Sequence, residues 1–347
     1  MLKFSQIKAQ LPLFARQSRK YALEMVASAQ SGHPGGSLSS MDFLSTLYLS
    51  RVMQSNEPVF VSNGHISPAV YAILASLGLH DPATVIKKFR RDSSIYEGHV
   101  TRHVKGVPFG TGPLGIGFSA AAGCALAHKI QGSDKKIFVT IGDGESQEGQ
   151  VYETLHFIHK NNLNNLITFM DYNLVQLTAS LQETMPINPK AHFKAAGFNV
   201  IEVAGHNFKA LHKALAKALK SQKPVLILAK TIMGQGSNFM QPEGQAHRST
   251  WHGKAPKPQD IEQDLEALRL SETESKKLNQ FLKRYNRLPK LVKEAKFFKP
   301  LAVNSQIKVG KPRLYTTEIL TDNRSAYGNA LLDLAKANKS VVALTAD

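Results

Sequence analysis

Two polar residues that could bind a metal and a phosphate follow two apolar runs of the sequence. The run 137–141 ends shortly before Asp143, and the run 166–170 ends shortly before Asn173. Both side chains offer hard oxygen ligands, the kind that Mg²⁺ or Ca²⁺ takes from a protein while a bound phosphate supplies others. Glycines on either side of Asp143 let a backbone approach a ligand closely. The stretch therefore predicts a site for a divalent cation and a diphosphate.

For these two residues to meet, the two runs must be strands of one sheet. The segment between them has a helical pattern, which makes a strand–turn–helix–strand unit, and ligands of open α/β sheets bind at the carboxyl ends of the strands. Strands alternate with helices along the chain, so we predict an α/β fold, a doubly wound parallel sheet with helices on both faces. The other predicted strands are 59–61, 198–203 and 225–229, and the main helices are 4–29, 41–52, 71–77, 116–130 and 208–219.

Loops and caps should connect these elements in specific ways. Residues 93–117 are predicted to form a loop, whose glycine density suggests a backbone laid against something flat. The helix 116–130 is small and apolar all round, which is typical of a helix packed closely on a sheet or a partner. Pro34 should end the first helix, and Ser39 or Ser40 should cap the next one.

The last quarter of the chain differs in composition. A charged helix is predicted over 260–288, broken near Ser271, and a Lys-rich connector follows it. A helix at 324–337 and a strand at 341–344 then indicate the start of a second α/β domain, because one such unit cannot bury a core alone. We expect three parts: a first domain at 1–256, a charged helix and linker at 257–313, and an incomplete second domain at 314–347.

The charge and the cysteine count narrow the class of protein. The 347 residues carry a formal charge of +17, and the segment 276–313 holds twelve Lys or Arg residues and one acid. Nucleic-acid binding is the less favoured explanation, since this segment lacks aromatic stacking and zinc-finger patterns; attraction of anionic sugar phosphates explains the sign equally well. The single Cys124 excludes an internal disulfide, and no apolar run could span a membrane. A cytoplasmic enzyme is therefore expected.

Several motifs together resemble the transketolase family. Gly142-Asp143-Gly144, with Asn173 downstream, resembles the family's thiamine-diphosphate motif. The resemblance runs from the N-terminus to about residue 256 and resumes at Arg324. The other matching stretches, in the family's order, are Ser31-Gly32-His33-Pro34-Gly35, Ser62-Asn63-Gly64-His65, Gly98-His99, Thr111-Gly112-Pro113-Leu114-Gly115 and Trp251-His252-Gly253.

The resemblance implies bound thiamine diphosphate and a divalent metal, Mg²⁺ or Ca²⁺. Asp143, Asn173 and the backbone carbonyl of Val175 would hold the metal. The expected cofactor-binding residues are Ser31, His65, Gly112, Pro113, Leu114, Gly142, Asp143, Gly144, Asn173 and His252. The expected catalytic residues are His33, His65, His99 and His252, which suit proton transfer at neutral pH, together with two acids at a subunit interface, Glu148 and Glu153. The expected substrate-binding residues are His33, Arg324 and Asp347.

The implied activity is transketolase activity, the transfer of a two-carbon unit from a ketose phosphate to an aldose phosphate in the pentose phosphate pathway. The family's activating glutamate would lie beyond the last residue. A homodimer or a hetero-oligomer with a chain bearing the pyrimidine-binding domain is therefore expected. Two alternatives stay open: a thiamine-diphosphate-binding module or partner subunit without turnover, and a related dihydroxyacetone or deoxyxylulose phosphate synthase.

Plainer roles exist for the same residues. A histidine at a strand end can be a satisfied structural residue, and Asp143 could be only the N-cap of the next helix. Glu148 and Glu153 could be ordinary solvated acids. Glu145 is expected to be a first-turn acid favoured by the helix dipole, and not a ligand.

Overall fold

The computed structural model describes residues 1–292, 307–311, 313–316, 318–319 and 321–343. The chain divides into two compact units, Met1–Ala295 and Lys296–Asp347. In the part of the chain that is described, no helix is long and apolar enough to cross a membrane.

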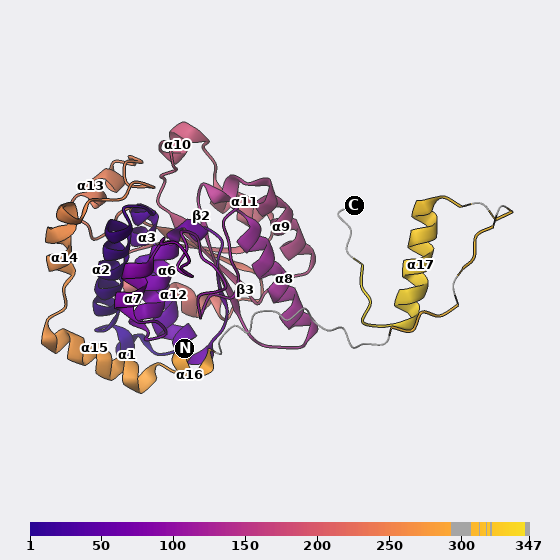
Figure 1. Ribbon diagram of the computed structural model, residues 1–347, viewed down its shortest axis with the longest axis horizontal. Helices are drawn as coiled ribbons and strands as arrows, with labels where there is room; N and C mark the ends of the chain where they lie inside the picture. The colour runs from indigo at the N-terminus through magenta and orange to yellow at the C-terminus, as the bar shows by residue number, and fades with distance from the viewer. Residues whose placement is uncertain (293–306, 312, 317, 320, 344–347) are drawn as a thin grey trace. The chain divides into compact units, whose positions relative to one another are not determined.

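The first unit is built on one parallel sheet, as predicted. Its five strands lie in the order β1-β2-β3-β5-β4 (Figure 1). Strands with continuous apolar runs are typical of parallel sheets, because both faces are covered. The strands are β1 Val59–Val61, β2 Ile137–Gly142, β3 Leu166–Tyr172, β4 Asn199–Ala204 and β5 Val225–Lys230.

Helices cover both faces of this sheet, which confirms the doubly wound arrangement. Alternate residues of β2 enter different cores: Phe138 joins one cluster, while Ile137 and Val139 join another. The first cluster includes residues of α2 Leu11–Ala29, α4 Met41–Leu47, α6 Ser67–Ser76 and α12 Phe208–Ala218. The second includes residues of α8 Ile116–Ile130, α9 Gly149–Lys160 and α11 Pro189–Ala195. Figure 1 shows these two groups of helices on either side of the strands.

The N-terminal helices differ from the prediction in detail. The predicted first helix is split into α1 Phe4–Ile7 and α2, and Pro34 opens a short helix, α3 Pro34–Ser39. The helix after it continues as the π-helix η1 Tyr48–Val52. Neither serine caps α4: Ser40 makes no side-chain cap bond, and Ser39 donates instead to Asp171, 2.6 Å away. The predicted cap was therefore wrong, because a buried carboxylate takes the Ser39 hydroxyl.

Short helices complete the first unit. The segment predicted as a charged helix is indeed broken at Ser271, whose hydroxyl accepts from Glu274 N–H at the start of α15. Arg16 of α2 forms an ion pair with Glu274 of α15 at 2.9 Å, and this contact holds the segment against α2 within the first unit. The remaining elements are α5 Met53–Ser55, η2 Gly64–Ile66, α7 Pro82–Lys88, η3 Glu145–Gln147, α10 Leu181–Thr184, α13 Met240–Gln245, η4 Pro258–Ile261, α14 Glu262–Leu268, α15 Glu272–Tyr285 and α16 Leu288–Leu291.

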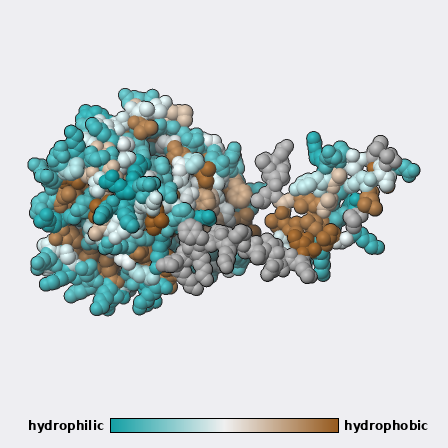
Figure 2. Space-filling model, viewed as in Figure 1, coloured by the Kyte–Doolittle hydropathy of each residue, from teal (hydrophilic) through white to brown (hydrophobic). Residues whose placement is uncertain are grey.

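The second unit contains one helix, α17 Asn323–Ala337, among its described residues. Asp322 caps it by accepting from Ser325 N–H at 2.9 Å, yet none of its residues is buried. Figure 2 shows apolar side chains gathered over this unit. The strand predicted at 341–344 is wrong for 341–343, which are not extended into a ladder, and Leu344 lies outside the described residues. A strand needs a neighbour for its hydrogen bonds, and the described residues of this unit supply none.

Candidate cofactor site

Asp143 and Asn173 lie side by side at the carboxyl edge of the sheet, because β2 and β3 are adjacent strands. One oxygen of Asp143 accepts from Gly144 N–H at 2.7 Å, and the other accepts from Leu174 N–H at 2.7 Å. The carboxylate therefore ties the turn after β2 to the turn after β3. A carboxylate oxygen has two lone pairs, so each oxygen can still bind a cation.

Asn173 is held in one orientation by its neighbours. Its Nδ2 donates to Asp171 Oδ2 at 2.8 Å, and its Oδ1 accepts from Val175 N–H at 2.9 Å. Asp171 also accepts from the hydroxyls of Ser39 and Thr231. Because the amide nitrogen is committed to Asp171, the amide oxygen is the atom left to serve as a ligand.

The two acids create an unbalanced negative charge. Burial, together with the nearby charge of Asp171, raises the pKa of Asp143 to about 7, and burial also raises the pKa of Asp171. Neither acid forms an ion pair with any described residue of the chain. A divalent cation bound beside these two buried carboxyls would stabilise their charged forms, since its positive charge offsets the effect of burial on their pKa values.

The donor set fits a hard cation that is shared with a ligand. No three His, Cys, Asp or Glu side chains gather as a complete metal site within the described ranges. A cation at Asp143 and Asn173 would therefore need oxygens from the backbone and from a bound phosphate. Mg²⁺ is usually held in this way, by one or two protein side chains plus substrate phosphates. The residues thus fit a metal–diphosphate better than a free metal.

Four histidines from four separate segments gather in the cavity that also holds these acids. His33 lies 5.2 Å from His65, 6.2 Å from His99 and 5.9 Å from His252, measured between ring centroids. His65 and His252 are 5.6 Å apart. The segments are distant in sequence, so this histidine cluster exists only in the folded chain.

Burial and mutual proximity keep these histidines neutral. Burial, followed by the charges of His252, Arg90 and His99, lowers the pKa of His33 to about 4. The pKa of His65 is well below its usual value for the same reasons, burial first and the neighbouring histidines second. Burial likewise lowers the pKa of His99 and His252. Each neutral imidazole offers one N–H donor and one acceptor, and the Nδ1 of His33 has no partner among the described residues.

Glycines bring the segments of the histidine cluster together. Gly35 N–H donates to the carbonyl of Trp251 at 3.0 Å, and a Cβ at Gly35 would lie 2.7 Å from that oxygen. A Cβ at Gly64 would collide with the side chain of Thr111, which itself donates to Val61 O at 2.8 Å. The loop carrying His33 and the loop carrying His252 can therefore touch only through glycine.

The cavity has a volume of about 380 Å³ and is lined by both the acids and the histidine cluster. It collects most of the residues predicted from the sequence. Those that line it are His33, His65, His99, Gly112, Leu114, Gly142, Asp143, Gly144, Glu148, Asn173, Val175 and His252.

The other predicted residues of the first unit do not line this cavity. The hydroxyl of Ser31 accepts from Arg90 at 2.5 Å and, like Pro113, does not line the cavity. Glu153 is exposed on α9 and also lies outside the lining. The two substrate contacts predicted in the second unit, Arg324 and Asp347, stay predictions. Arg324 is an exposed residue of α17, and Asp347 lies outside the described residues.

Glu145 is a residue whose role the sequence did not reveal. It is 3% exposed, and its carboxyl accepts from Gly115 N–H at 2.8 Å, Gly142 N–H at 3.0 Å and the hydroxyl of Ser62. Burial raises its pKa to about 7. Glu145, expected to be a first-turn acid, instead holds three segments of the site together through these hydrogen bonds. A first-turn position looks the same in sequence whichever way the side chain turns.

Asp171 and Gln176 are among the further lining residues that were missed. Asp171 stands between the second apolar run and Asn173, and an acid at a strand end was a usable signal for it. Gln176 had no such signal. It reaches the cavity because Leu174 adopts a left-handed φ of 64°, a conformation that β-strand patterns do not predict.

Comparison with known proteins gives a consistent result. A family profile described as the transketolase, thiamine diphosphate binding domain matches residues 12–291. A 6-deoxy-6-sulfo-D-fructose transketolase subunit from Clostridium sp. (strain MSTE9) is 36% identical over 66% of this chain and 87% of its own. One of the apulose-4-phosphate transketolase subunits, from Phocaeicola vulgatus, is 31% identical over 73% of this chain and 92% of its own.

The fold has solved counterparts of greater length. The crystal structure of transketolase from Campylobacter jejuni superposes with a TM-score of 0.75 and 27% identity, covering 95% of this chain and 56% of that one. The chain thus spans about half the length of the full-length transketolases that it matches.

Proposed function

The chain belongs to the transketolase family through its thiamine-diphosphate-binding domain, and we propose that it binds thiamine diphosphate and a divalent cation as one half of a ketol-transferring enzyme. One observation carries this proposal: buried acids and four neutral histidines line the same cavity of about 380 Å³. That volume is in the range of small-molecule sites, about 300–1,000 Å³. A cavity lined by both acids and N–H donors suits a metal bound to a diphosphate.

We assign the cation to the side-chain oxygens of Asp143 and Asn173 and to the carbonyl of Val175. Mg²⁺ is the expected ion and Ca²⁺ the alternative, with phosphate oxygens completing the coordination. The diphosphate would accept from the neutral imidazoles of His65 and His252, and it would share the N–H of Gly144 with Asp143, the present acceptor of that group, since N–H donors to an anion make strong hydrogen bonds.

When bound, thiamine diphosphate supplies a thiazolium ring that stabilises the carbanion left when a ketose is cleaved. The protein's part is to position the substrate and to move protons. His33 and His99 face the same cavity, and as neutral imidazoles they can each donate to one sugar oxygen and accept from another. The glycine loop at Gly112, with Pro113 and Leu114, would lie along the aminopyrimidine ring.

The substrates are proposed to be sugar phosphates, with a ketose as donor and an aldose as acceptor. A second candidate donor is a modified ketose, because two relatives that match over 87% and 92% of their own length are named as a 6-deoxy-6-sulfo-D-fructose and an apulose-4-phosphate transketolase subunit. A dihydroxyacetone or deoxyxylulose phosphate synthase differs in its acceptor, and product analysis with several aldehydes separates these activities.

The working enzyme is proposed to be an oligomer in a reducing, cytoplasmic compartment. Both of those relatives are named as subunits, which supports a partner chain bearing the pyrimidine-binding domain; a homodimer is the alternative. Glu148 at the cavity rim and Glu153 on the exposed side of α9 would face that partner. We propose residues 1–256 as the diphosphate-binding domain, 257–313 as a charged helix and a Lys-rich linker, and 314–347, with Arg324 and Asp347, as the beginning of the pyrimidine-binding domain.

Ketol transfer from xylulose 5-phosphate to ribose 5-phosphate tests this function. The chain is assayed with thiamine diphosphate and Mg²⁺, alone and mixed with a chain that carries the pyrimidine-binding domain. A seven-carbon sugar phosphate should form in the mixed sample. It should form with the chain alone as well if the chain can transfer the ketol unit without a partner. Cofactor binding without transfer in either sample would leave only a binding module.

A further inference from the structure

Gln176 carries a hydrogen-bond donor that the described part of the protein does not use. Its side-chain Nε2 is shut off from solvent and has no acceptor among the described residues. The residue lines the cavity that also holds Asp143 and Asn173. Buried polar groups are nearly always paired, so an unpaired one in a ligand cavity points to a missing acceptor.

The backbone of Gln176 is firmly placed. Its N–H donates to Ala179 O at 2.9 Å, and the preceding Val175 forms an antiparallel bridge with Ser180. Leu174, two residues earlier, donates its N–H to Asp143 at 2.7 Å. The segment is therefore a small closed turn fixed to the metal-binding edge, and the side chain has a defined starting point.

The side chain lies against the glycine turn after β2. A Cβ built on Gly144 would come within 3.3 Å of Gln176 Cγ and Cδ and within 3.4 Å of Nε2. The amide therefore packs against Gly144, and both residues line the cavity. Gly144 is the residue whose N–H is proposed to contact the diphosphate, so the two donors stand next to each other.

The neighbouring acceptors of the described chain each accept a hydrogen bond already, and none of them accepts from Gln176 Nε2. Both oxygens of Asp143, the nearest acid in the turn, accept backbone N–H bonds. The amide oxygen of Asn173 accepts from Val175. An anionic oxygen placed between the cation and the turn would satisfy Nε2, and hydrogen bonds to charged acceptors are about twice as strong as neutral ones.

We propose that the side-chain amide of Gln176 donates from Nε2 to a diphosphate oxygen of thiamine diphosphate. This inference rests on the proposed function and adds a residue to the cofactor's phosphate site. Gln176 would act as a binding residue, selective for the phosphates over the rings of the cofactor.

Cofactor affinity tests the proposal without any need for turnover. The chain contains one tryptophan, Trp251, next to His252 of the cavity, so its fluorescence can report binding. Thiamine diphosphate is titrated in the presence of Mg²⁺ into the wild-type chain and into Gln176→Ala and Gln176→Glu, with calorimetry as a second readout. Thiamine, which has no phosphate, serves as the comparison ligand.

We expect Gln176→Ala to raise the Kd for thiamine diphosphate by roughly ten- to a hundredfold, the usual loss for a bond to a charged group. Gln176→Glu keeps the shape but places a carboxylate against the phosphates, so its Kd should rise further. The weak affinity for thiamine should stay the same in all three proteins. A matched control is Gln150→Ala, because the Nε2 of that glutamine is already paired with Ser119 at 2.6 Å.

The possible results separate the inference from the function on which it rests. Tight, Mg²⁺-dependent binding by the wild type with equal affinity in both Gln176 variants would overturn the role of Gln176 and leave the proposed function standing. An equal loss for thiamine and thiamine diphosphate would also overturn it, since the phosphates would not be involved. Absence of binding by a wild-type chain that unfolds cooperatively would overturn both.

Discussion

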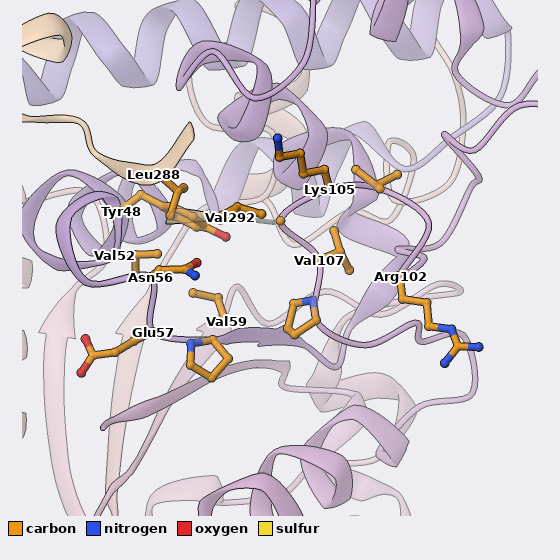
Figure 3. A pocket seen from close by; sticks show the side chains of 14 residues that line it. Tyr48, Val52, Asn56, Glu57, Val59, Arg102, Lys105, Val107, Leu288 and Val292 are labelled. Atoms are coloured by element: carbon orange, nitrogen blue, oxygen red, sulfur yellow. The ribbon is translucent and has the colours of Figure 1, made fainter. Parts of the chain in front are cut away.

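Two cavities lie at opposite edges of one parallel sheet, and they differ in what their polar groups do. At the carboxyl edge, the acids and histidines around Asp143 face inward. At the amino edge, a cavity of about 250 Å³ is lined mainly by apolar residues such as Val52, Val59 and Val107. Figure 3 shows these valines facing the cavity, while the carboxyl of Glu57 points away from its centre.

The acids of the two edges make the contrast quantitative. Glu57 accepts from Arg51 at 2.5 and 2.6 Å, from Ser55 at 2.8 Å and from Lys136 N–H at 3.1 Å. Burial alone would raise its pKa, but the bond from Arg51 and the other donors hold the pKa below its usual value. The pKa of Asp143 is raised, because burial disfavours its charged form and the charge of Asp171 adds to that effect. At the amino edge, Arg51 neutralises the charge of Glu57. At the carboxyl edge, Asp143 has no such cationic partner among the described residues and is available to a ligand.

The largest expected effect comes from exchanging the acids of the two edges for alanine. Asp143→Ala should weaken Mg²⁺-dependent binding of thiamine diphosphate by at least about a hundredfold, because a charged ligand of the metal is lost. Glu57→Ala should leave the Kd unchanged and lower the free energy of unfolding, since it removes the acceptor of Arg51. Calorimetric titration and chemical denaturation of both variants measure these effects. If wild type and Asp143→Ala bind the cofactor with equal affinity, the acid of the carboxyl edge has no role in cofactor binding, and the proposed contrast with Glu57 is wrong.

Glu145→Ala should cost about 3 kcal/mol in the free energy of unfolding, because the N–H groups of Gly115 and Gly142 and the hydroxyl of Ser62 would lose their acceptor. Glu145→Gln should cost less, since one oxygen can still accept. Urea denaturation at neutral pH gives both values. If alanine and glutamine cost the same, the three bonds do not hold the loops of the site.

Acid should destabilise the carboxyl edge through its buried histidines, among them His33. Its folded pKa of about 4 lies below the ordinary 6.5, so the unfolded chain binds a proton first as the pH falls. The stability that depends on neutral His33 is present above pH 6.5 and is lost between about 6.5 and 4. After allowance for partial solvent screening, His33→Asn should reduce this acid loss by about 2 kcal/mol. Unfolding curves that shift equally with pH in both proteins would contradict this role of His33.

The smallest effect is expected at Tyr48, whose hydroxyl points into the amino-edge cavity in Figure 3. Tyr48→Phe should change the free energy of unfolding by less than about 0.5 kcal/mol and should not change cofactor affinity, since no side-chain hydrogen bond joins that hydroxyl to a described residue. Denaturation and cofactor titration of this variant measure both quantities. A measurable loss of cofactor binding would show that the two edges are coupled.

Much of the fold could be predicted because a buried parallel sheet has a plain signature. The five strands predicted between residues 59 and 229 all exist, since the strands of a buried parallel sheet are rich in apolar residues. The adjacency of Asp143 and Asn173 could be predicted as well, because the two residues end two such runs. The strand predicted at 341–344 failed for its described residues, because pattern alone cannot supply a neighbouring strand.

The roles of Glu145, Gln176 and Ser39 could not be predicted, because the sequence does not show in which direction a side chain points. Glu145 has the sequence position of a helix-start acid, and only the packing of three loops turns its carboxyl inward. Gln176 enters the cavity after a left-handed residue, Leu174. Ser39 lost its expected capping role because Asp171 competes for its hydroxyl. Each outcome depends on contacts between segments far apart in the sequence.

Binding of a metal–diphosphate in the carboxyl-edge cavity can be measured directly. The wild-type chain is titrated with thiamine diphosphate, in Mg²⁺ and again in excess chelator, with Trp251 fluorescence and calorimetry as readouts. We expect saturable binding to one site per chain in Mg²⁺, weakened at least about tenfold by the chelator. Binding that is equally strong without a divalent cation, or no binding by the folded chain, would contradict the assignment of this cavity.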